Sequence, residues 1–153
     1  MSQPVAAVRL GLATVVLAVA ALGCESPPTT TTASPASQIF ELQVMVRDGA
    51  VRALDAECAG AAPFLYVHMG AAYRIAERPD GTTVMSGALP AGRAVPAFEG
   101  GLGIPREPSF CLFSWMASLD RGPEYQFMLE EGDPVPFDLD SLDEERRITI
   151  VLP

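Results

Sequence analysis

The stretch FCLFSWMASL, residues 110–119, is the most apolar run of the chain beyond residue 24. Its aromatic side chains, Phe110, Phe113 and Trp115, fall on both faces of an extended backbone, because successive side chains of a strand point to opposite sides. A strand that is apolar on both faces is typical of a covered position inside a sheet, and aromatic residues favour strands. We therefore expect residues 110–119 to form a central strand.

Half-exposed strands are predicted on either side of this run. Residues 39–47, IFELQVMVR, alternate apolar and polar side chains, which predicts a strand with one solvent-facing side. Residues 125–130 and 147–152 alternate in the same way. Residues 73–77 and 82–86 are separated by RPDG, a sequence that favours a tight turn, so we expect them to form a hairpin.

Three further segments are less regular. Asp48-Gly49 favours a tight turn, after which residues 50–58 are expected to return as a hairpin partner, although the spacing of their apolar residues also fits a helix. Residues 64–69, FLYVHM, are apolar on both faces and predict a buried strand. Residues 87–109 are rich in Gly and Pro and are expected to be mostly loop, with a short strand over 93–98.

Seven or eight short strands without a convincing amphipathic helix indicate an all-β fold. We predict a small antiparallel β-sandwich of immunoglobulin-like architecture over residues 39–153. The spacing that marks the immunoglobulin family itself is missing, since Trp115 follows both Cys58 and Cys111 instead of lying between them. The prediction is therefore of an architecture and not of a family.

The first 24 residues have the features of an export signal. An apolar run over residues 10–22 follows Arg9 and ends in Ala21-Leu22-Gly23-Cys24. Its length is that of a signal-peptide core, and it is shorter than the roughly 20 residues that span a membrane comfortably. The segment resembles the lipobox of bacterial lipoproteins, in which the Cys receives a diacylglyceryl group and becomes the mature N-terminus. Two alternatives are ordinary cleavage after residue 20 and an anchor that is never cleaved.

The resemblance implies a signal peptide over residues 1–23 and lipidation of Cys24. Residues 24–38, rich in Pro, Thr and Ser, are then expected to be an extended linker, because they contain too little apolar surface to fold. The protein is expected on the extracytoplasmic side of the cell membrane, attached to it through the lipid. Beyond residue 23 the chain has nine basic and 19 acidic residues, and this charge of −10 argues against a nucleic-acid partner.

The remaining cysteines, Cys58 and Cys111, form an even pair in a compartment that favours oxidation. We expect a structural disulfide between them, with two buried free thiols as the alternative. Neither cysteine belongs to a C-x-x-C motif, which argues against redox catalysis.

Candidate catalytic and metal-binding residues are few. His68 is the only histidine, and no motif supplies a nucleophile for it. Glu130-Glu131 and Glu144-Glu145 are possible carboxylate pairs. Oxygen ligands for Ca²⁺ are dense in the acidic stretch 133–145, where the weak candidates are Asp138, Asp140 and Asp143.

We therefore predict a non-enzymatic binding or structural module at the cell envelope, without a cofactor. A structural, hydrogen-bonded role is the favoured interpretation of His68, and a solvated turn that of the acidic stretch. The first alternative is a small exported enzyme that uses His68 or paired carboxylates. The second is a Ca²⁺-dependent adhesion or assembly module.

Overall fold

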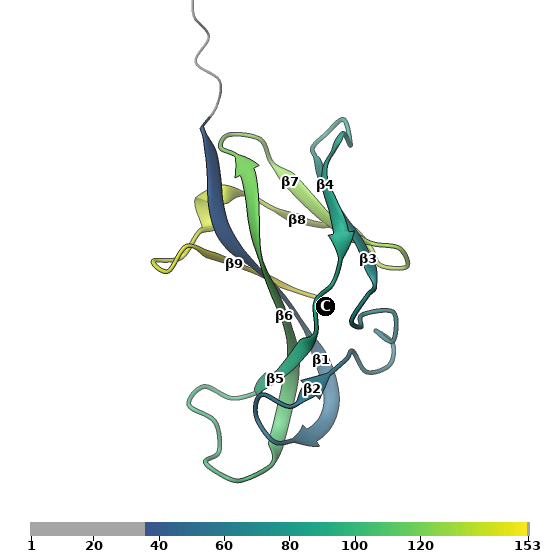
Figure 1. Ribbon diagram of the computed structural model, residues 1–153, viewed down its shortest axis with the longest axis vertical. Coiled ribbons are helices and arrows are strands. Elements are labelled where there is room, and N and C mark those ends of the chain that lie inside the picture. The colour runs from purple at the N-terminus through teal and green to yellow at the C-terminus, as the bar shows by residue number, and fades with distance from the viewer. Residues whose placement is uncertain (1–35, 153) are drawn as a thin grey trace, which may run out of the picture. The chain divides into compact units, whose positions relative to one another are not determined.

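The computed structural model describes residues 36–152, which fold into two packed β-sheets (Figure 1). The five-stranded sheet has the order β2-β5-β6-β1-β9 and the four-stranded sheet the order β4-β3-β7-β8. The elements are β1 (Ser37–Arg52), β2 (Glu57–Cys58), β3 (Ala72–Glu77), β4 (Thr83–Ala88), β5 (Gly92–Pro96), β6 (Glu107–Asp120), β7 (Tyr125–Leu129), β8 (Val135–Phe137), the 3₁₀ helix η1 (Leu139–Ser141) and β9 (Arg147–Val151). The predicted β-sandwich is confirmed.

The core lies between the two sheets and is built from alternate side chains of their strands. Leu42 and Val44 of β1 are fully buried, and Ile75 of β3 and Phe127 of β7 are buried in the same cluster. Along β1 the neighbours of the buried residues are more exposed, so the period-two pattern of that stretch corresponds to an inner and an outer face. The burial of this apolar surface is the main favourable contribution to folding.

The stretch 110–119 forms most of β6, the central strand of the five-stranded sheet. Val44 of β1 lies opposite Phe113 on one side, and Arg93 of β5 lies opposite Leu112 on the other. The predicted central position is thus confirmed. The predicted hairpin of residues 73–86 is confirmed as well, as antiparallel β3 and β4.

The prediction for Asp48-Gly49 is wrong. The chain does not turn there. β1, which is 16 residues long, continues past this point to Arg52, with a bulge between Arg47 and Val51. Gly49 has a φ of +70°, which lets the strand take up the extra residues without reversing. Residues 50–58 are consequently not a hairpin partner of β1, and only Glu57–Cys58 form a strand, which pairs with β5.

The prediction of a buried strand over residues 64–69 is also wrong. This segment is a series of turns, closed by backbone hydrogen bonds from Phe64 to Ala61 and from Val67 to Phe64. Only Val67 is fully buried, whereas Leu65 is 68% and Met69 57% exposed. Apolar composition without alternation did not distinguish a strand from turns that place one side chain in the core.

The last strand, β9, lies at the edge of its sheet and pairs with β1 in parallel, whereas the other strand pairs are antiparallel. Within residues 36–152 the structure contains no helix that is long and apolar enough to cross a membrane. The signal peptide, Cys24 and nearly all of the predicted linker lie outside the described residues.

Candidate functional site

The structure places Cys58 of β2 and Cys111 of β6 at disulfide distance, with the two sulfur atoms 2.08 Å apart. The bond attaches the two-residue edge strand to the central strand of the sheet. A Cβ atom at Gly92 of β5 would lie 2.5 Å from the Sγ atom of Cys111, so a glycine is required beside the bond. Both sulfurs belong to buried residues, and the bond therefore acts as a structural link.

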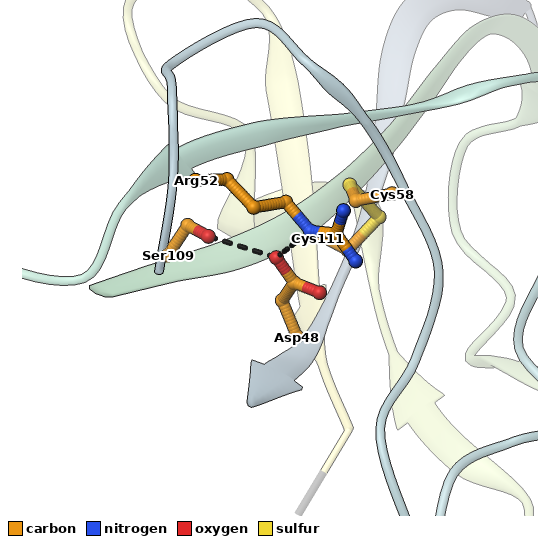
Figure 2. The surroundings of a disulfide bond; sticks show 5 residues. All are labelled: Asp48, Arg52, Cys58, Ser109 and Cys111. Atoms are coloured by element: carbon orange, nitrogen blue, oxygen red, sulfur yellow. Dashed lines mark hydrogen bonds and ion pairs between the residues drawn. A yellow bond between two sulfur atoms is a disulfide. The ribbon is translucent and has the colours of Figure 1, made fainter. Parts of the chain in front are cut away.

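A buried carboxylate holds the bulge of β1 close to this disulfide (Figure 2). One oxygen of Asp48 accepts hydrogen bonds from Nε of Arg52, at 2.7 Å, and from Oγ of Ser109 in β6, at 2.8 Å. The other oxygen, Oδ1, is buried without a hydrogen-bond partner. Because a buried charge is costly unless it is paired, this network specifies the position of the bulge against β6.

A second buried carboxylate holds the loop between β5 and β6, residues 97–106. Glu107 is buried and accepts a hydrogen bond from the backbone N–H of Leu102. Gly101, with a φ of +65°, allows the approach, because a Cβ atom there would lie 3.0 Å from Oε1 of Glu107. Backbone bonds from Gly101 to Phe98 and from Ala97 to Pro108 close the loop further.

These two carboxylates support a surface that we call the apolar end. It consists of exposed side chains from the end of β1, from the turn that follows it and from the 97–106 loop: Val51, Leu54, Phe98, Leu102 and Ile104. The three loop residues are each more than half exposed, at 54%, 51% and 52%. A cavity of about 290 Å³ lies beside them, with Val51, Ala97 and Phe110 in its lining. Exposed apolar side chains that gather in one region are a feature of interaction sites in soluble proteins.

The apolar end lies at the far end of β1 from the point where the chain enters the sandwich. Ser37, the first residue of β1, pairs with Asp120, whereas Arg52, the last, pairs with Glu107 next to the loop. A strand of 16 residues is about 50 Å long. Figure 1 shows the loop before β6 at the opposite end of the fold from the start of β1.

His68 and one predicted carboxylate pair, Glu130-Glu131, line a single cavity of about 290 Å³. The two were predicted as separate alternatives, and the structure brings them together across 62 positions of the chain. His68 is exposed, and its Nδ1 atom lies 2.9 Å from the backbone oxygen of Met69. The second pair lies elsewhere: Glu145 forms an ion pair with Arg147 of β9.

The weak calcium candidates do not converge. Asp138 caps η1 and accepts a hydrogen bond from the N–H of Ser141, at 2.9 Å. Asp143 accepts from the N–H and Nε of Arg147; desolvation alone would raise the pKa of Asp143, but these bonds outweigh it and lower the pKa. Asp140 is exposed in η1. No group of three or more His, Cys, Asp or Glu side chains among residues 36–152 is placed to hold a metal ion.

The aromatic side chains divide between the core and the surface. Tyr73 and Trp115 pack with their ring centroids 4.7 Å apart, and Phe113 is fully buried, as expected of core residues. Phe98, in contrast, belongs to the apolar end. Sequence reasoning missed that surface, since Leu102 and Ile104 show no periodicity within their Gly- and Pro-rich loop.

No protein-family model, no curated protein and no solved structure matches this chain.

Proposed function

We propose that this protein is a lipid-anchored, exported bacterial lipoprotein whose β-sandwich binds a partner protein on the extracytoplasmic side of the cell membrane. The domain acts without catalysis, and the apolar end is its contact surface. The observation that carries the proposal is the position of this surface: it lies at the opposite end of β1 from residue 37, where the linker joins the domain. A tether at one end leaves the other end free to meet a partner.

The anchor in this proposal is supported by the sequence. An apolar core of signal-peptide length ends in Gly23-Cys24, and a Cys with two or three acyl chains gives stable membrane attachment. A disulfide between Cys58 and Cys111 fits the same location, because disulfides persist in oxidising compartments outside the cytoplasm.

The binding surface is supported by how its loop is held. Phe98, Leu102 and Ile104 are exposed on a loop whose backbone Glu107 holds at Leu102, which reduces the backbone entropy lost on binding. Rigid loops on a β-scaffold commonly carry recognition residues. The aromatic and aliphatic side chains favour a protein partner, whose own apolar side chains they would cover.

The first test is the intact mass of the protein extracted from membranes, before and after reduction and alkylation. The proposal requires a chain that begins at Cys24 and is heavier than its sequence by a lipid, with two alkylatable thiols only after reduction. An unlipidated chain that begins near Ala21 would contradict the anchor.

The second test concerns the apolar end. A photoreactive side chain placed at Leu102 should cross-link to a discrete partner protein in cells. The matched position is Met116, which is 65% exposed on the outer face of β6, away from the loop. The adduct at Leu102 should disappear when Phe98 and Ile104 are changed to Ser. Equal cross-linking from both positions, or none from Leu102, would refute the proposed surface.

One observation favours the alternative, a small exported enzyme: His68 shares a cavity with Glu130 and Glu131. An imidazole and a carboxylate on one cavity are the groups that general acid–base catalysis uses. If the alternative holds, His68→Ala abolishes a hydrolytic activity of the purified protein toward ester or glycoside substrates while the fold, followed by circular dichroism, is retained.

A further inference from the structure

We propose that a groove between β8 and β9 binds an extended peptide segment in which an apolar side chain is flanked by Arg or Lys. The groove has a volume of about 450 Å³ and its lining includes Pro63, Phe64, Tyr66, Val135, Val151 and Leu152. None of these residues belongs to the apolar end, so this site is separate from the surface in the proposed function. An experiment that refutes one of the two sites leaves the other untouched.

The walls of the groove are apolar and belong to the free edges of both sheets. β8 is the last strand of the four-stranded sheet and β9 that of the five-stranded sheet. Val135 comes from the first strand and Val151, half exposed, from the second. Extended peptides commonly bind along the edge strands of a sheet, with alternate side chains in pockets. Phe64 and Tyr66, packed edge to face, supply an aromatic wall.

The rim of the groove is acidic. Asp133 lines the groove itself, and Glu130 and Glu131 line the neighbouring cavity, which shares Tyr66 with it. Gly132 joins these acids beneath the Tyr66 ring: a Cβ atom there would lie 3.1 Å from the tyrosine hydroxyl. All three carboxylates are exposed, and within residues 36–152 none of them forms an ion pair.

Charge complementarity therefore selects the occupant. The residues that line the two cavities include no Arg, so one unpaired negative charge faces the groove and two face the cavity next to it. Such a potential attracts cationic groups and repels anionic ones, and it acts within a screening length of about 8 Å at physiological ionic strength. In such a peptide, the apolar side chain would contact the apolar walls of the groove, and the neighbouring Arg or Lys would pair with the carboxylates of the rim.

The purified full chain tests this with two dye-labelled, N-acetylated pentapeptides, RVLVR and EVLVE, followed by fluorescence anisotropy. Saturable binding of the basic peptide is expected, at least about tenfold tighter than that of the acidic peptide, and it should weaken as salt is added. The absence of saturable binding of RVLVR at millimolar concentration would overturn the proposal. Equal affinity for both peptides would overturn it as well, because the rim would then contribute nothing.

Charge variants locate the binding. The triple variant Glu130→Gln/Glu131→Gln/Asp133→Asn should bind RVLVR about tenfold more weakly, as expected for the loss of three exposed charge contacts. The matched control Glu99→Gln/Asp140→Asn/Glu144→Gln removes the same charge from exposed positions outside the groove and should change the affinity by less than about twofold. Equal losses in the two variants would indicate non-specific attraction and refute the site. Val151→Ser, within the apolar wall, should weaken binding without changing its salt dependence.

Discussion

At the scale of single residues, the two buried carboxylates are the most informative feature of this protein. Acidic side chains are rarely buried unless they are paired, so each needs a structural or functional reason. Asp48 fixes the bulge of β1 through Arg52 and Ser109, and Glu107 fixes the loop through Leu102. Both carboxylates act on segments that carry residues of the apolar end.

Replacement of Asp48 by Ala should destabilise the fold by about 2 kcal/mol, because Ser109 loses its partner in a buried position and Arg52 loses its counter-ion. Urea unfolding followed by circular dichroism measures this loss. Glu124→Ala is the matched control, since Glu124 also pairs with an arginine, Arg78, but its side chain is 70% exposed. That change should be worth at most about 1 kcal/mol, and an equal effect of the two substitutions would contradict the role of burial.

The raised pKa of Tyr125 leads us to expect that the protein loses stability in alkali. Burial raises the pKa of its phenol, and the negative charges of Glu77 and Asp120 raise it further. As the pH rises past about 10, the unfolded chain loses this proton before the folded protein does, so stability present below pH 10 is lost above it. The melting temperature of Tyr125→Phe should therefore fall less between pH 8 and pH 11 than that of the wild type. The same fall in both proteins would exclude this contribution.

At the scale of elements, the sequence around the bulge in β1 correctly indicates a left-handed backbone at Gly49 but wrongly predicts a chain reversal. Asp48-Gly49 has the composition of a turn, and Gly49 does adopt a positive φ. Yet the strand continues, because Val51 and Arg52 resume pairing with β6 and the Asp48 carboxylate is buried against Ser109. A turn and a bulge need the same residues, and only the partner strand decides between them.

Gly49→Ala should destabilise the protein by about 3 kcal/mol. Part of this loss, about 1 kcal/mol, comes from the left-handed backbone, and the rest from a Cβ atom that would lie 2.7 Å from Cβ of Ala61. Gly70→Ala is the control, because Gly70 has a φ of +85° but no atom within 4 Å of the added Cβ, so only the first loss of about 1 kcal/mol applies. In urea unfolding, Ala61→Gly should restore part of the stability of Gly49→Ala. Equal losses at positions 49 and 70 would show that the contact with Ala61 is unimportant.

At the scale of the whole molecule, the sequence predicts the strands whose side chains alternate between the core and the solvent. The alternation in β1 and β9 and the doubly apolar run in β6 indicate the sandwich, whereas β7, predicted to be half exposed, is buried on both faces at Met128 and Leu129. The candidate sites were not predictable in this way. The backbone of Leu102 is held by a hydrogen bond to the buried Glu107, and the cavity of His68 and Glu131 joins residues distant in the chain. Such features follow from tertiary packing, which has no period in the sequence.

The disulfide is expected to contribute to the stability of the whole sandwich. Cys58 and Cys111 are 53 positions apart. In the chain-entropy model, closing a loop of this length raises the free energy of the unfolded chain by about 4 kcal/mol. The strand that carries Cys58 has only two residues, so few other interactions hold it to the sheet. Cys58→Ala/Cys111→Ala should therefore melt on the order of 15 °C lower than the wild type, and the wild type with reductant should approach this value.

The double alanine variant is preferable to serine, because Cys111 is fully buried and a hydroxyl there would add an unsatisfied polar group. Reductant should leave the melting temperature of the alanine variant unchanged, which separates loss of the bond from other effects of the reagent. Since the stabilisation acts through the unfolded chain, the fluorescence of Trp115, the only tryptophan, should be the same in the folded variant and wild type. A wild type whose melting temperature does not respond to reductant would show that the bond contributes no net stability, and the two-residue strand β2 would then have to be held by its pairing with β5 alone.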